Sequence, residues 1–300
     1  MKYFTLIILP FLVIGTCVDA QVVNDRQPVE SAQSRTTDHS WTIGVSGGTA
    51  VIEQFSDQNF VGISVTKDLD ESYVSASLSY IDSGNIPGLI NNVPASTTEI
   101  TVAAGTAVGA LNFDGYLSFG RRHFDVEPLS RNGRSVNIKS GGDAFGLGLS
   151  ASYDIILNES SFLTPIIGVD YNELDVGRVV LLPNGSQVAL ENKENGVTGN
   201  LGLAAQQLFG KENDHLLIVV ANIVTTSNTT SFNPGNAQYP VLRALALNDT
   251  PGQKDSWGEI GGSLSIALNR RLRLDLSVLR TIGFLNSDAT SLSTGLRYSF

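Results

Sequence analysis

Apolar side chains recur at every second position over most of this chain, from Trp41 to the last residue, Phe300. In Asp143–Tyr153 (DAFGLGLSASY) the large apolar residues share one parity, and Gly and Ser occupy the other. Successive side chains of a β-strand point to opposite faces, so this segment has one apolar face and one small, polar face. The pattern recurs in about twelve segments of roughly ten residues, the length that a tilted strand needs to cross a bilayer. The chain is therefore expected to be all-β.

The connections between these strands alternate in length. Short ones such as Asp68–Glu71 and Asn269–Arg270 take turns with long ones such as Asp82–Thr97, Glu173–Asn195 and Thr226–Asp255. A soluble exported β-sandwich would also alternate apolar and polar residues, but it has no reason to sort its loops by length. Outer-membrane barrels combine tight periplasmic turns with longer external loops. We therefore predict a transmembrane antiparallel β-barrel of about twelve strands, with both termini in the periplasm because the strand number is even.

Composition narrows the classes of function. No apolar run reaches the roughly 20 residues that a membrane-spanning helix needs. The 19 Lys and Arg residues are outnumbered by 29 Asp and Glu residues. This balance argues against nucleic-acid binding, which is driven by basic side chains that neutralise phosphates. The second face of the predicted strands is rich in Gly, Ser and Thr, as expected for side chains that fill a narrow barrel interior.

The N-terminal residues predict export. Lys2 is followed by an apolar stretch, Phe4–Gly15, and by small residues before Gln21, which is the order found in a signal peptide. The one cysteine, Cys17, lies in this segment, so the mature chain is expected to have no disulfide and no cysteine-bound metal. The predicted organisation is a signal peptide at residues 1–20, a flexible polar lead-in at 21–40 and the barrel at 41–300.

Catalytic chemistry has little support. The three histidines are His39 in the lead-in, His215 beside Asp214 in a predicted periplasmic turn, and His123 at the outer end of a strand with Asp125 nearby. An outer-membrane enzyme needs a base placed to activate a serine or a water. Only His123 has a suitable place, and a plain loop residue is its simpler interpretation. No nucleotide-binding or zinc-protease motif occurs, so we expect no catalytic residue, no metal and no cofactor.

Seven charged residues fall on the inward parity of the predicted strands. Charges on an inner wall either pair with one another or set an ion preference, and both interpretations stay open. The seven residues are Asp154, Asp170, Glu259, Arg271, Arg273, Asp275 and Arg297.

A second group of charges surrounds a predicted external loop, and it is basic although the whole chain is acidic. We hypothesise that it contacts anionic lipopolysaccharide; the alternative is an ordinary solvated loop. The group consists of Arg121, Arg122, Arg131, Arg134 and Lys139.

Three segments carry a family resemblance: the closing GLRYSF, the strand Leu163–Tyr171 (LTPIIGVDY) and the run Glu191–Leu203 that leads into GNLGLA. In these segments the chain resembles the translocator domain of autotransporters, and the resemblance covers residues 41–300. It implies a twelve-stranded barrel. Leu296, Tyr298 and Phe300 alternate at the end of the chain, which is how outer-membrane barrels present their last strand to the barrel-assembly machinery.

The family carries a secreted passenger before its barrel, whereas only residues 21–40 precede the predicted barrel here. The resemblance therefore implies an outer-membrane protein that acts as a passive conduit or a structural barrel. The alternative is a surface scaffold whose long loops bind a partner or host molecule, and an outer-membrane enzyme comes third. The expected location is the cell outer membrane, and the expected partners are its lipid, lipopolysaccharide and the barrel-assembly machinery.

Overall fold

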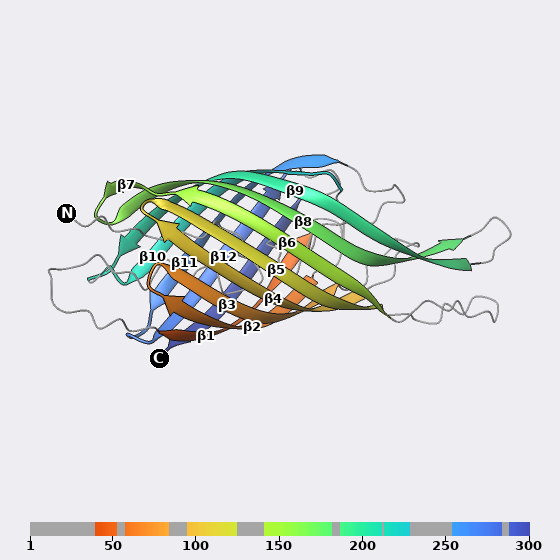
Figure 1. Ribbon diagram of the computed structural model, residues 1–300, viewed down its shortest axis with the longest axis horizontal. Helices are drawn as coiled ribbons and strands as arrows, with labels where there is room; N and C mark the ends of the chain where they lie inside the picture. The colour runs from red at the N-terminus through yellow and green to blue at the C-terminus, as the bar shows by residue number, and fades with distance from the viewer. Residues whose placement is uncertain are drawn as a thin grey trace.

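The strands form one antiparallel sheet that closes on itself, because the first strand, β1 (Trp41–Ile52), pairs with β2 (Gln58–Leu69) and also with the last strand, β13 (Ala289–Ser299) (Figure 1). The computed structural model describes residues 40–52, 58–83, 95–124, 141–181, 187–211, 213–228, 254–283 and 288–300. The expected signal peptide, and the lead-in except for Ser40, lie outside the described residues. The strands are β1 (Trp41–Ile52), β2 (Gln58–Leu69), β3 (Ser72–Ser83), β4 (Ala95–Val108), β5 (Leu111–Phe124), β6 (Gly141–Tyr153), β7 (Ile155–Asn158), β8 (Ser161–Leu181), β9 (Gln187–Phe209), β10 (His215–Thr226), β11 (Asp255–Ala267), β12 (Leu272–Ile282) and β13 (Ala289–Ser299).

The closed barrel has twelve strands around its wall, because β6 and β7 together occupy one position. Ala144–Ser152 of β6 pairs with Ile166–Leu174 of β8, and β7 pairs with the start of β8. Asp154 separates β6 from β7. The antiparallel β-barrel of about twelve strands that alternation and loop length predicted is thus confirmed, and the periplasmic location of both termini stays a prediction.

Side chains alternate between the outside and the inside of the barrel, as strand geometry requires. On β10, Val219 is 49 % exposed and its neighbour Val220 is 1 % exposed. The outer surface of the other strands likewise carries large apolar side chains, which form a belt suited to lipid. The part of the chain that the structure describes contains no helix long and apolar enough to cross a membrane.

One sector of the inner wall is apolar, which the small, polar composition of the inward face did not predict. Its side chains come from β8, β9 and β10 and are buried together. They are Phe162, Ile166, Ala204, Leu208, Leu216, Ile218 and Val220.

Tight turns and the C-terminus lie at one end of the barrel (Figure 1). Gly109 and Gly210 adopt positive φ angles of 67° and 96° in two of these turns, a conformation that costs glycine little. At the same end, Trp41 and Phe300 exchange two backbone hydrogen bonds of 3.1 and 2.9 Å. These bonds hold the first strand to the last residue of the chain.

The segment Glu173–Asn195 differs from its prediction as a long loop, because most of it is strand. β8 and β9 continue as a paired hairpin to Leu181 and Gln187, and this hairpin projects beyond the neighbouring strands (Figure 1). Charged residues interrupt the apolar alternation here: Asp175 is the cross-strand partner of Lys193. A hairpin that projects from the belt has no lipid-facing side, so the apolar signal for a strand is lost while the backbone pairing persists.

Candidate functional site

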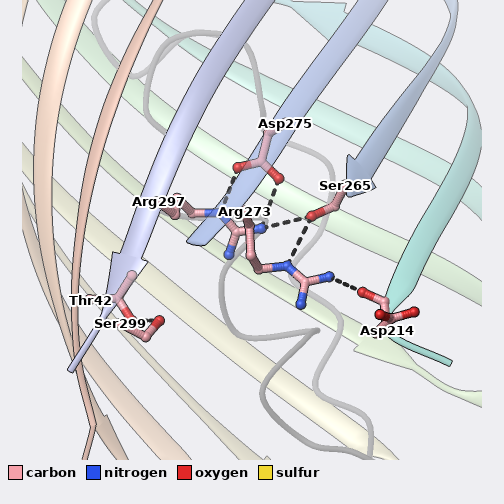
Figure 2. A network of polar contacts seen from close by, with 7 residues as sticks. All are labelled: Thr42, Asp214, Ser265, Arg273, Asp275, Arg297 and Ser299. Carbon is pink, nitrogen blue, oxygen red and sulfur yellow. Dashed lines mark hydrogen bonds and ion pairs between the residues drawn. The ribbon is translucent and has the colours of Figure 1, made fainter. Parts of the chain in front are cut away.

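The barrel interior gathers most of the charged side chains that the inward parity predicted, and their partners define its chemistry. Arg297 on β13 reaches across to Asp275 on β12 and makes two hydrogen bonds, Nε to Oδ2 at 2.6 Å and Nη2 to Oδ1 at 2.8 Å (Figure 2). Nη2 also donates to Ser265 Oγ at 3.0 Å. Arg297 is 3 % exposed and the Asp275 side chain is 15 % exposed, so this is a largely buried, two-point ion pair that holds three neighbouring strands in one arrangement.

Arg273 extends the network toward the turn between β9 and β10. Its Nε donates to Ser265 Oγ at 3.3 Å, and its Nη2 donates to the backbone carbonyl of Asp214 at 2.5 Å (Figure 2). His215 follows Asp214 and accepts a hydrogen bond from the backbone N–H of Ala267 through Nδ1. This hydrogen bond connects His215, at the start of β10, to the end of β11, so the histidine stabilises the turn and the adjoining strands.

Two tyrosines each reach along the inner wall to a carboxylate on the next strand but one, over a glycine of the strand between them. Tyr116 donates to Asp170 Oδ1 at 2.6 Å above Gly148, and Tyr73 donates to Asp114 Oδ1 at 3.1 Å above Gly105. A Cβ atom at Gly105 would lie 2.2 Å from Cε1 of Tyr73. The glycines therefore leave the space that each ring occupies.

Farther along the wall, Glu259 accepts hydrogen bonds from Trp257 Nε1 at 2.6 Å and Asn222 Nδ2 at 3.3 Å. Glu259 and Glu99 are both buried. Glu99 and Asp114 were not singled out from the sequence, although the parity rule could have found them, since apolar Ile100 and Phe113 lie on the opposite, outward parity.

The remaining predicted site residues divide between the interior, the surface and the undescribed segments. Asp154 and Asp170 are buried on the inner wall, whereas Arg271 is exposed in the turn before β12. Arg121 is exposed and pairs with Asp143 at 2.7 Å.

Arg122 points inward and donates to the backbone carbonyl of Asp175 at 2.6 Å, so it does not share a surface with Arg121. Arg131, Arg134, Lys139 and the His123 neighbour Asp125 lie outside the described residues. His123 itself is exposed on β5. Among the residues with described positions, no group of three or more His, Cys, Asp or Glu side chains could hold a metal ion.

Proteins that span the bacterial outer membrane are closed antiparallel barrels with an even number of strands, an apolar belt outside and polar groups inside. The fold and the interior described above place the chain in this class. Comparison with known families then gives the particular family. The sequence model of the Autotransporter beta-domain matches residues 60–278, and the chain belongs to this family.

Solved structures agree on the fold. The beta domain of the Bordetella autotransporter BrkA is 17 % identical, with 88 % of this chain and 100 % of that chain covered and a TM-score of 0.60. The translocator domain of the autotransporter NalP from Neisseria meningitidis is 15 % identical, with 88 % and 90 % covered and a TM-score of 0.53. An outer membrane channel from Pseudomonas putida F1 is 9 % identical, with 91 % and 100 % covered and a TM-score of 0.51. A search of curated protein sequences found no match.

Proposed function

We propose that the chain is exported to the cell outer membrane and acts there as a structural barrel of the autotransporter type, with an interior too narrow to be an open pore. The burial of its inner wall carries this proposal. Asn112, Ser118, Thr164 and Ala204 point inward from β5, β8 and β9, and each is 0 % exposed. A wide, water-filled lumen would leave such side chains accessible, so the interior resembles the packed interior of a small barrel.

Gel mobility and conductance test this role together. The unheated protein in detergent is expected to migrate differently from the boiled protein, and cell fractionation is expected to place it in the outer membrane. In planar bilayers the folded protein should give no large, steady unitary steps. Large steps from a heat-modifiable sample would instead establish a passive conduit. A heat-insensitive protein in the soluble periplasmic fraction would refute the barrel's membrane role.

The projecting β8–β9 hairpin supports a second candidate, a surface scaffold that binds a partner or host molecule. Lys193 lies on this projection and pairs with Glu173 at 2.6 Å while its side chain stays 60 % exposed. Extension past the apolar belt places such side chains in water, where a partner can reach them. This role requires the hairpin end of the barrel to be external, and therefore the tight turns to be periplasmic.

Single-cysteine labelling checks that orientation. The sequence has one cysteine, Cys17, in the expected signal peptide. Lys193→Cys is expected to react with a membrane-impermeant maleimide on intact cells, and Asp70→Cys, in the turn between β2 and β3, is expected to react only after the outer membrane is permeabilised. The reverse pattern would place the hairpin in the periplasm and remove the scaffold role.

We further propose that the last strand serves as the assembly signal. Leu296, Tyr298 and Phe300 are exposed on the outside of the barrel, and the rings of Tyr298 and Phe300 stack with centroids 6.1 Å apart. This outward apolar row is accessible to the assembly machinery. Arg121 is exposed and can contact lipopolysaccharide. Arg122 points into the barrel, so its side chain does not support that contact.

A further inference from the structure

Asp154 is a buried carboxylate whose side-chain contacts are all neutral. It accepts hydrogen bonds from Asn112 Nδ2 at 3.1 Å and from Thr164 Oγ1 at 2.9 Å. Gln206 Nε2 donates to Thr164 Oγ1 at 3.3 Å, which extends the cluster to β9. No basic side chain among the described residues contacts Asp154. Asp275, in contrast, receives two hydrogen bonds from Arg297.

Two more oxygen atoms of the same cluster are buried without a hydrogen-bond partner. Asn112 and Gln206 are 0 % and 2 % exposed, and neither Oδ1 of Asn112 nor Oε1 of Gln206 receives a hydrogen bond. Each oxygen belongs to an amide group that contacts Asp154 directly or through Thr164. Buried polar atoms without partners are costly, and an ionised carboxylate only accepts hydrogen bonds. The cluster therefore has more acceptor atoms than the donors around it satisfy, and its carboxylate receives only neutral donors.

We propose that Asp154, Asn112, Thr164 and Gln206 bind a hard metal cation through oxygen ligands. Carboxylate, amide and hydroxyl oxygens are the ligands that such cations prefer. The terminal amides of Asn112 and Gln206 present their oxygens by rotation, since the two ends of an amide have nearly the same shape. The cation gives Asp154 the counter-charge that Arg297 gives Asp275, and it ties β5, β8 and β9 together beside the junction of β6 and β7.

Thermal unfolding in different salts tests the site. Purified, metal-stripped protein in detergent is heated in CaCl₂, MgCl₂, NaCl or tetramethylammonium chloride at equal ionic strength, and the loss of the folded form is followed on unheated gels. At a saturating concentration, at least one metal is expected to raise the unfolding midpoint by about 5 °C over tetramethylammonium, which is too large to be coordinated. Titration calorimetry with that metal is expected to show one binding site.

Asp154→Asn keeps the shape of the side chain and is expected to abolish both the midpoint shift and the calorimetric binding. In tetramethylammonium this variant should unfold at a higher temperature than the unsubstituted protein, because it lacks the uncompensated carboxylate. Asp170→Asn, at another buried carboxylate, is the matched control and should keep the metal effect. If Asp154→Asn fails to fold, Gln206→Met is expected to weaken metal binding at least tenfold. A metal effect absent from the unsubstituted protein, or unchanged in these Asp154 or Gln206 variants, would overturn the proposal.

Discussion

Replacing Arg297 by methionine is expected to destabilise the folded barrel by about 3–5 kcal/mol, because the Asp275 carboxylate is then left without its partner in a buried site. Arg297 is 3 % exposed and makes both of the short contacts to Asp275. Urea-induced unfolding in lipid vesicles measures the change in the free energy of unfolding.

Arg121 and Asp143 provide the matched control for this prediction. Their contact is similarly short, at 2.7 Å, but the two side chains are 73 % and 70 % exposed. Water already solvates both charges, so Arg121→Met should cost less than about 1 kcal/mol. The double variant Arg297→Met with Asp275→Leu should recover most of the lost stability, because no charge is then buried alone. Equal losses for Arg297→Met and Arg121→Met would contradict the structural role of the buried pair.

Gly105→Ala is expected to destabilise the barrel by about 3 kcal/mol or more. The added Cβ atom would lie 2.2 Å from both Tyr73 Cε1 and Asp114 Oδ1, so the ring and its 3.1 Å hydrogen bond must be displaced. Tyr73 is 1 % exposed and its ring cannot move aside into solvent. The expected loss combines overpacking with a weakened hydrogen bond to a carboxylate. The same unfolding measurement applies.

Gly199→Ala serves as the control for steric crowding. A Cβ atom at Gly199 would meet Thr225 Cγ2 at 3.8 Å, which is ordinary van der Waals contact. This variant should change the free energy of unfolding by less than about 1 kcal/mol. Tyr73→Phe separates the two causes, because it removes the hydrogen bond while keeping the ring above Gly105. Comparable stability of the Gly105→Ala and Gly199→Ala variants would show that the ring adapts easily.

The sequence predicted the parity of the strands better than it predicted the contacts between them. Alternation was enough to place Asp154, Asp170 and Arg297 on the inner wall, because strand geometry alone decides the face. The partner of Arg297 depends on register: Arg273 is its direct cross-strand neighbour, whereas Asp275 lies diagonal to it. A single sequence does not give that register. The sequence therefore could not decide whether the inward charges pair with one another or set an ion preference.

Two other features of the fold could not be predicted from the sequence, for physical reasons. The projecting part of the β8–β9 hairpin has polar surroundings, so the apolar signal of a membrane strand is missing there. The inner apolar sector was hidden because Leu216, Ile218 and Val220 alternate with equally apolar Leu217 and Val219. When both faces of a strand are apolar, composition no longer distinguishes inside from outside.

The pairing of β1 with β13 has a consequence for the order of folding. Apart from β6 and β8, which are separated by the short strand β7, all other neighbours in the wall are consecutive along the chain and can pair locally from a turn. The pairing of β1 with β13 instead joins residues such as Thr42 and Ser299, which are 257 positions apart. The entropy of bringing such distant segments together is concentrated in this single contact. We therefore expect an open, curved sheet with two unpaired edges to form first, and the pairing of β1 with β13 to close the barrel late in folding.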